Sequence, residues 1–213
     1  MQNDEFMDFL KSAFSNAQRN MKEGAGFYVF YASRTHIEFE TALIDSGLSV
    51  KEQLIWAKNT FTLGRQDYQW KHEPCLYGWK EGASHYFVNN HSFSTLFDDG
   101  KDIEKMTNQE LIETIKEMRD DMDAGTIVHA KRPNANDIHP TMKPVNLIGR
   151  FVSNSSRKGD IVLDIFGGSG STLIACEKLG RRCATMEFDP YYCDAIIQRY
   201  EELTGVKAVE INV

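Results

Sequence analysis

Two groups of residues near the C-terminus have the composition of a nucleotide-like binding site. Residues 161–172 read Ile-Val-Leu-Asp-Ile-Phe-Gly-Gly-Ser-Gly-Ser-Thr, an apolar strand that ends in Asp164 and enters a glycine-rich turn before a helix. Glycine lets a ligand approach the backbone where a side chain would block it. Glu187 follows Gly170 by seventeen residues and ends a second predicted strand. A carboxylate there can accept hydrogen bonds from ribose hydroxyls, so the pair predicts a site for a nucleoside-bearing cofactor.

Three cofactor classes compete for this turn. A phosphate-binding loop requires Gly-Lys-Ser/Thr, and no lysine follows the turn, which argues against a nucleoside triphosphate. A dinucleotide turn reads G-x-G-x-x-G, but Leu173 stands in place of the third glycine and little chain remains for a second nucleotide-binding half. S-adenosylmethionine has no pyrophosphate, and Asp164 and Glu187 suit its ammonium and ribose groups, respectively. The residues therefore favour S-adenosylmethionine.

Several motifs resemble those of a known family. Residues 164–172, His139-Pro-Thr-Met-Lys-Pro144 and Glu187-Phe-Asp-Pro-Tyr-Tyr192 resemble the S-adenosylmethionine-binding half of DNA amino-methyltransferases. Their order, with a recognition region first and the glycine motif near the C-terminus, resembles the beta group, which methylates adenine N6 or cytosine N4. Residues 64–78 resemble the start of the recognition region in phage and prophage members.

This resemblance implies a cofactor site made of Asp164, Phe166, Gly168, Gly170, Glu187, Thr141 and Lys143. Glu187 would bind the ribose hydroxyls, and Thr141 and Lys143 would lie beside the methionine end. Without the resemblance, Thr141-x-Lys143-Pro144 also fits a plain helix N-terminus, where proline is common at the first position.

The family motif that holds the methyl acceptor is absent from these 213 residues. In the family it is an acid, Asn or Ser followed by Pro-Pro and an aromatic residue, and it positions the amine of a base extruded from the duplex. No Pro-Pro occurs here, and Asp189-Pro-Tyr-Tyr192 is better explained as the start of a helix. We therefore predict no catalytic residue in this chain. The strand that carries the motif would precede residue 4, so the chain is expected to be the C-terminal portion of a methyltransferase.

The predicted elements give an α/β fold. Helices at 4–21 and 35–46 alternate with strands at 27–31 and 50–58, which implies parallel pairing with helices on both faces of a sheet. The same alternation returns near the C-terminus, with helices at 144–155, 171–179 and 190–203 and strands at 160–165, 182–187 and 206–213. The aromatic-rich residues between them break it and include one helix at 108–122, entered through a capping box, and a strand at 126–130.

We therefore predict a Rossmann-like, S-adenosylmethionine-dependent methyltransferase fold with an inserted recognition lobe and one central strand missing. Residues 1–58 would form the acceptor-side half of the sheet, residues 59–138 the target-recognition insertion, and residues 139–213 the cofactor-binding half.

The charge distribution permits DNA as a partner although the net charge is −7. Residues 98–123 hold ten acids and four bases, whereas residues 126–158 hold six bases and one acid. Such asymmetry allows a local anionic partner, although chance clustering on a solvated surface is the favoured explanation of the charges alone. The candidate DNA contacts are Arg65, Lys71, Lys131 and Arg132. Tyr68 and Trp70 fit either stacking on bases or packing in a core.

Other classes of protein fit the sequence less well. The histidines lack metal-ligand spacing, so no metal is predicted, and no apolar run has the length of a membrane helix. The four cysteines suit buried thiols in a reducing compartment such as the bacterial cytoplasm. Besides DNA, the expected partners are a separate N-terminal fragment or a second copy of the chain. A catalytically inactive DNA-binding relative, and a methyltransferase for RNA or a small molecule, stay open as alternatives.

Overall fold

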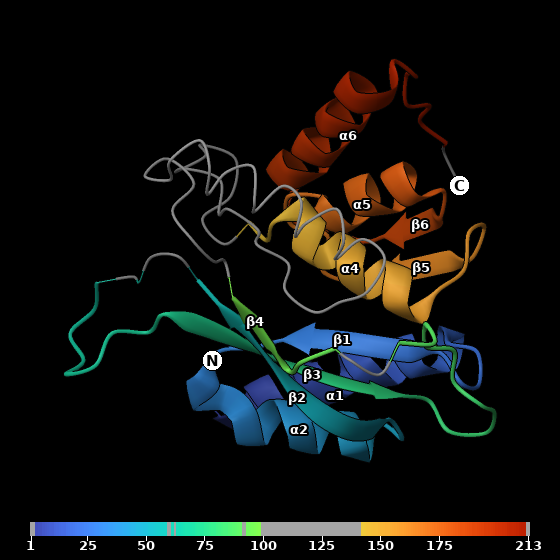
Figure 1. Ribbon diagram of the computed structural model, residues 1–213. Helices are drawn as coiled ribbons and strands as arrows, with labels where there is room; N and C mark the ends of the chain where they lie inside the picture. The colour runs from blue at the N-terminus through green and yellow to red at the C-terminus, as the bar shows by residue number, and fades with distance from the viewer. Residues whose placement is uncertain (1–2, 59–60, 62, 91–92, 99–141, 212–213) are drawn as a thin grey trace, which may run out of the picture. The chain divides into compact units, whose positions relative to one another are not determined.

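The protein is described by a computed structural model that covers residues 3–58, 61, 63–90, 93–98 and 142–211 (Figure 1). The chain divides into two compact units, residues 1–132 and 133–213. Both units contain helices and strands, so the predicted α/β class is confirmed.

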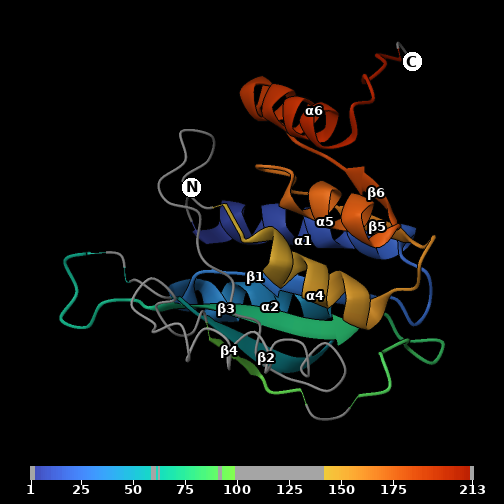
Figure 2. The same ribbon diagram turned by 45° about the horizontal axis from the view of Figure 1, so that its top comes forward.

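The first unit contains a four-stranded sheet. Its elements are α1 (Asn3–Asn20), β1 (Gly26–Phe30), the short 3-10 helix η1 (Ser33–Thr35), α2 (His36–Asp45), β2 (Ser49–Ala57), β3 (His72–Trp79) and β4 (Leu96–Asp98). The strand order is β1-β3-β2-β4, which can be followed in Figure 2. β3 runs antiparallel to both of its neighbours, whereas β4 is parallel to β2.

The expected direct pairing of strands 27–31 and 50–58 is wrong. β3 lies between β1 and β2, which run in the same direction but each pair with β3. The sequence of β3 hides its central position, because Pro74 lacks an N–H and both proline and glycine are unusual inside a central strand. Gly78 is required there, since a Cβ at this position would overlap the Ser49 carbonyl of β2.

The predicted functional division of the chain stays a prediction. β3 and β4 lie within residues 59–138 yet belong to the same sheet as β1 and β2, so part of that range is structurally continuous with residues 1–58. The second unit begins at residue 133, near the expected boundary at 139. The predicted helix at 108–122 and strand at 126–130 lie outside the described residues.

Helices α1 and α2 pack on one face of the four-stranded sheet. The buried residues of this core are Leu10, Phe14, Phe27, Tyr31, Ala42, Leu43, Leu48 and Leu76. The other face of the sheet carries aromatic side chains, including a stacked pair, Tyr28 and Tyr77, whose ring centroids lie 4.8 Å apart. Tyr77 is buried and also contacts Phe87 from the segment that follows β3, so part of the aromatic content of residues 59–138 packs within the first unit.

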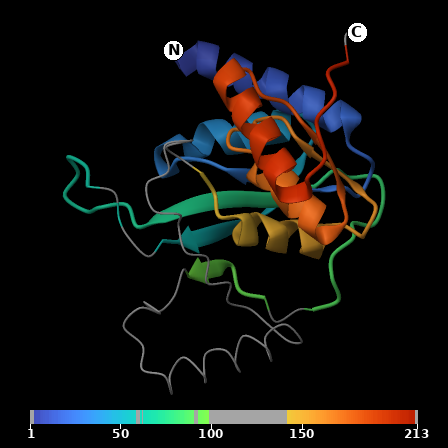
Figure 3. The same cartoon turned by 90° about the horizontal axis from the view of Figure 1, so that it is seen from above.

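The second unit contains two parallel strands and three helices. Its elements are α4 (Val145–Ser155), β5 (Ile161–Asp164), α5 (Ser171–Leu179), β6 (Arg182–Thr185) and α6 (Pro190–Thr204). β5 and β6 pair in parallel, with Ile161 opposite Arg182 and Asp164 opposite Thr185. α5 connects the two strands and contacts both α4 and α6 (Figure 3). This strand–helix–strand unit places the ends of β5 and β6 side by side.

The predicted final strand at 206–213 is wrong for its described part. Residues 206–211 form no strand, and their apolar side chains Val206, Val209 and Ile211 are exposed. Alternating apolar residues become a strand only when a neighbouring strand satisfies their backbone groups. Within the described residues, no strand pairs with this segment.

None of the described helices combines the length and apolar character needed to cross a membrane.

Neighbouring residues of α2 provide a test of the first unit's core. Leu43 is fully buried (0% exposed), whereas Ile44 is 56% exposed. We expect Leu43→Ala to lower the free energy of unfolding by about 2–5 kcal/mol because it leaves a cavity, and Ile44→Ala to change it by less than about 0.5 kcal/mol. Urea unfolding followed by tryptophan fluorescence measures this unit alone, because Trp56, Trp70 and Trp79 all lie in it. Equal effects of the two variants would contradict this packing.

Candidate functional site

The glycine turn of the second unit joins the end of β5 to the start of α5. Gly168 and Gly170 have positive φ angles of 51° and 76°, which other residues rarely adopt, and Gly170 caps the N-terminus of α5. The Gly170 N–H donates to the Gly167 carbonyl at 2.8 Å, which closes the turn. At its start, the Phe166 N–H donates to Asp164 Oδ1 at 3.1 Å. Asp164, Phe166, Gly168 and Gly170 therefore lie together, as predicted.

Gly167, which sequence reasoning did not single out, fixes the turn against β6. Its N–H donates to the Met186 carbonyl at 2.8 Å. A Cβ at this position would lie 2.6 Å from Thr185 Oγ1 and 3.2 Å from the Met186 carbonyl oxygen. The turn thus approaches the end of β6 so closely that a side chain at Gly167 would force Thr185 and the Met186 carbonyl to shift. The Gly-Gly pair in the sequence was the available signal for this.

Glu187 connects the turn to the next helix. Its Oε2 accepts the Gly168 N–H at 2.6 Å, and its Oε1 accepts the N–H groups of Phe188 at 2.8 Å and Asp189 at 3.0 Å. Hydrogen bonds to an ionised acceptor are shorter and stronger than neutral ones. The carboxylate therefore accepts three backbone N–H groups, one from the turn and two from the residues that lead into α6.

Helix α6 supports the turn from behind. Ile196 packs against Gly170, where a Cβ would lie 3.1 Å from its side chain. Arg199, one turn later, donates to the Ser169 carbonyl, and burial lowers the pKa of its guanidinium. Asp189 caps α6 by accepting the Tyr191 N–H at 2.9 Å, with Pro190 at the first position. The interpretation of Asp189-Pro-Tyr-Tyr192 as the start of a helix is therefore confirmed.

Aromatic side chains lie next to these carboxylates in the sequence and are exposed. Phe188 follows Glu187 and is 99% exposed, and Phe166 is also exposed. An exposed aromatic face next to a hydroxyl-binding acid can stack on a purine. Phe188 was not predicted as a site residue, because its exposure is a tertiary property that the sequence does not state.

Lys143 lies near the start of α5, and its expected place beside the methionine end of the cofactor stays a prediction. Its carbonyl accepts the Ser171 hydroxyl at 2.8 Å, which ties the segment before α4 to the N-terminus of α5. Thr141 is not among the described residues.

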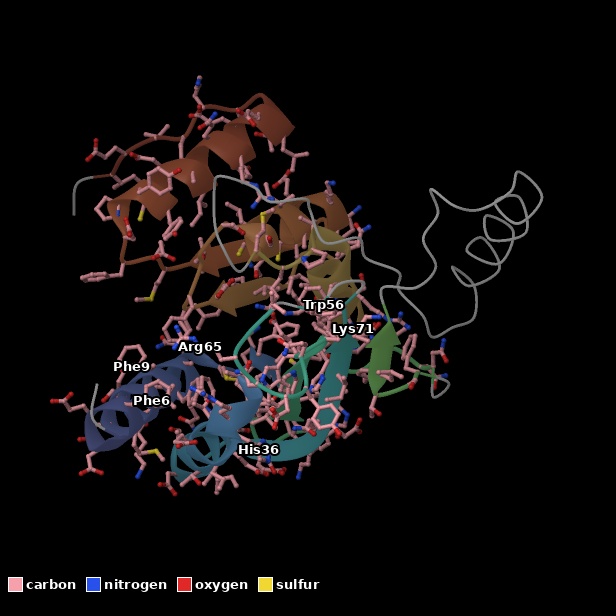
Figure 4. All side chains as sticks on the ribbon, turned by 90° about the vertical axis from the view of Figure 1, so that its left-hand side faces the viewer. Phe6, Phe9, His36, Trp56, Arg65 and Lys71 are labelled. Atoms are coloured by element: carbon pink, nitrogen blue, oxygen red, sulfur yellow. The ribbon has the colours of Figure 1, made fainter. Side chains whose placement is uncertain are left out.

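The candidate DNA contacts fall elsewhere in the chain. Arg65 and Lys71 lie in the first unit, between β2 and β3, and are labelled in Figure 4. Lys131 and Arg132 lie outside the described residues. The described part of the chain contains no group of three His, Cys, Asp or Glu side chains that could hold a metal ion.

Comparison with known proteins identifies the family. The family model for DNA methylases of the N6/N4 methyltransferase type matches residues 2–199. The type II methyltransferase M2.MboI of Moraxella bovis is 40% identical over 68 residues, which are 32% of this chain and 25% of that protein. The chain thus spans about a quarter of the length of the curated relatives that it matches.

Solved structures share the fold. The complex of M1.HpyAVI with SAM has a TM-score of 0.67 at 22% identity, over 93% of this chain and 83% of that chain. The cytosine-N4-specific PvuII DNA methyltransferase has a TM-score of 0.67 at 19% identity, over 94% of this chain and 72% of that chain. The predicted Rossmann-like methyltransferase fold is confirmed. Because the family model takes in most of its length, the chain belongs to the DNA methylase family of amino-methyltransferases.

Proposed function

We propose that this chain binds S-adenosylmethionine in its second unit and serves in methyl transfer to an exocyclic amine of DNA, N6 of adenine or N4 of cytosine. The observation that carries the proposal is the 2.6 Å hydrogen bond between the Gly168 N–H and Glu187 Oε2. It brings a glycine turn and a hydroxyl-accepting carboxylate together at the ends of two parallel strands, where open α/β sheets bind ligands.

The donor set of this site fits the cofactor. Glu187 would accept a hydrogen bond from a ribose hydroxyl, Asp164 would offer a carboxylate to the ammonium group, and Phe188 would offer an aromatic face to the adenine. Lys143, and Thr141 by the family resemblance, would lie at the methionine end. Bound S-adenosylmethionine supplies an electrophilic methyl group, so the chain's own task is to hold and orient the donor.

Holding the acceptor requires residues that these 213 do not contain. An exocyclic amine is a weak nucleophile, and its alignment with the methyl group is the main part of the catalysis. The family's Pro-Pro motif is absent from the sequence. We therefore assign the acceptor-holding motif to a further polypeptide segment. A second copy of this chain cannot supply it, because that copy has the same sequence.

The strand pairing leaves room for such a segment. Among the described residues, β1 pairs only with β3 and β5 pairs only with β6, so each has one edge without a neighbouring strand. Unpaired strand edges can accept an additional strand through backbone hydrogen bonds. A strand that brings the acceptor motif could add at either edge.

We assign the DNA contacts to residues 59–138, the predicted target-recognition insertion. The proposed contacts are Arg65, Lys71, Lys131 and Arg132. Basic side chains of this kind neutralise phosphates without reading sequence.

Glu187→Gln tests the cofactor site. In glutamine an NH2 group replaces one carboxylate oxygen and can donate but not accept, so either the turn or the ribose loses a hydrogen-bond acceptor. We expect the dissociation constant for S-adenosylmethionine to rise by about 10- to 100-fold, the equivalent of one hydrogen bond to a charged group. Isothermal titration calorimetry measures it. Glu202→Gln, on the exposed side of α6, is the matched control and should bind normally. Unchanged affinity in Glu187→Gln would refute the assignment.

Two glycine variants test the shape of the turn. Gly167→Ala places a Cβ 3.2 Å from the Met186 carbonyl and displaces the turn, whereas a Cβ at Gly149 in α4 meets only ordinary contacts of 3.7 Å or more. We expect Gly167→Ala to weaken cofactor binding by about tenfold or more. Gly149→Ala should keep the wild-type affinity and gain up to about 1 kcal/mol of stability, because alanine favours a helix interior. The same titration, with thermal unfolding alongside, separates the two.

The need for a separate acceptor segment is tested by methyl transfer. Unmethylated DNA is incubated with labelled S-adenosylmethionine and this chain, and N6-methyladenine and N4-methylcytosine are quantified. The isolated chain should bind the cofactor yet transfer no methyl group, and the gene should encode an in-frame Asp-Pro-Pro-Tyr upstream of the codon for Met1 or on a neighbouring fragment. Transfer by the isolated chain would overturn the assignment of the acceptor motif to another segment. If co-expression with the Asp-Pro-Pro-Tyr segment restored no transfer, a catalytically inactive DNA-binding protein would be the better description.

A further inference from the structure

The loop between β2 and β3 presents apolar side chains to solvent. Tyr68 is 91% exposed and Leu63 is 82% exposed, and Trp70 is also exposed. We call residues 63–71 the β2–β3 loop. Its exposed apolar side chains are concentrated in nine residues, and such concentration marks a binding surface. Core packing, the alternative that the sequence left open for Tyr68, is excluded by its exposure.

The base of this loop is fixed to the sheet. The Lys58 N–H donates to the Lys71 carbonyl at 2.7 Å. The Lys58 ammonium forms an ion pair with Glu73 Oε1 at 2.5 Å, and its side chain is largely buried. Trp70 makes an edge-to-face contact with His72, with ring centroids 5.3 Å apart. The loop therefore leaves the sheet in a defined direction, which Figure 1 shows beyond the ends of β2 and β3.

The tip of the loop is held by its own hydrogen bonds. Gln69 Oε1 accepts the Gly64 N–H at 2.6 Å, and Gln69 Nε2 donates to the Gln66 carbonyl at 2.6 Å. Tyr68 lies inside this bracing and still projects into solvent. Because these hydrogen bonds hold the backbone around Tyr68, binding through its exposed ring orders little additional backbone. The ring is suited to a ligand with a flat apolar face.

The charges of the loop indicate the chemistry of that ligand. In the sequence, Arg65 and Lys71 lie on either side of Tyr68, and Asp67 is the only acid of the loop. Cations that alternate with aromatic side chains are typical of surfaces that bind nucleic acid, where cations contact phosphates and aromatic rings stack on bases. A base inside an intact duplex is already stacked on both faces. The ligand must therefore include an unstacked base.

We infer that Tyr68 stacks on a base at a point where the DNA duplex is opened, while Arg65 and Lys71 bind the flanking phosphates. This inference rests on the proposed function, because a methyltransferase of DNA bases has to open the duplex to reach its target. It adds a specific task for the β2–β3 loop, which is to occupy the gap left in the base stack.

Fluorescence anisotropy with two labelled duplexes tests this inference. One duplex is fully paired, and the other carries an internal abasic site that interrupts the stack. Wild-type protein should bind the interrupted duplex about tenfold more tightly, in the range that one stacked base contributes. Tyr68→Ala should lose this preference, and Tyr68→Phe, which keeps the ring, should retain it. Arg65→Ala and Lys71→Ala should weaken binding to both duplexes equally and reduce its salt dependence.

Controls separate this inference from the proposed function. Ile37→Ala removes another exposed apolar side chain of the same unit and should keep the preference. Tyr68→Ala should bind S-adenosylmethionine like the wild type. If the cofactor binds but wild type and Tyr68→Ala treat the two duplexes alike, the role of Tyr68 is wrong and the proposed function stands. If the cofactor does not bind to the wild type, the proposed function itself fails. If Tyr68→Ala instead abolishes self-association in sedimentation experiments without changing DNA binding, the loop is a protein interface and the inference is overturned.

Discussion

The hydrogen bond from the Gly168 N–H to Glu187 Oε2 is the constraint on which the second unit's site depends. β5 and β6 have only four residues each, so their pairing alone holds the strand ends weakly. The carboxylate links the turn after β5 to the residue after β6 and, through two further N–H groups, to the start of α6. One side chain therefore sets the relative positions of three segments. The proposed hydrogen bond to a cofactor hydroxyl would therefore form on a carboxylate whose position is already fixed.

This arrangement leaves little space for additional side-chain atoms at the glycines of the turn. Glu187 holds it from the β6 side, whereas Ile196 and Arg199 hold it from the α6 side. A turn fixed on both sides cannot relax around an added methyl group, because tightly packed regions transmit strain instead of absorbing it. The two positive-φ glycines satisfy the backbone geometry and Gly167 satisfies the packing. The three glycines thus serve two different physical requirements within one short sequence.

Features that depend on residues close together in the chain could be predicted from the sequence. Features that depend on contacts with distant elements could not. The glycine turn, the Asp189 cap and the order of helices follow from residues close to each other in the chain. β3 was missed because Pro74 and Gly78 are unfavourable in a central strand, and only the closeness of Ser49 explains the glycine. Residues 206–213 were assigned to a strand because apolar alternation says nothing about the presence of a pairing neighbour. The importance of Gly167 and the exposure of Phe188 also depend on packing against other elements.

The net charge of the chain and the charge of its proposed DNA-binding loop also have to be considered separately. A net charge of −7 describes the whole molecule, but charges act over a Debye length of about 8 Å at physiological ionic strength. The β2–β3 loop extends from the end of the sheet, and its base is held by an ion pair that neutralises the Lys58 charge internally. A phosphate bound along the loop is therefore influenced mainly by the loop's own charges, Arg65 and Asp67 near its tip and Lys71 at its base. The local excess of positive charge there, and not the net charge of the chain, determines whether this surface attracts a nucleic acid.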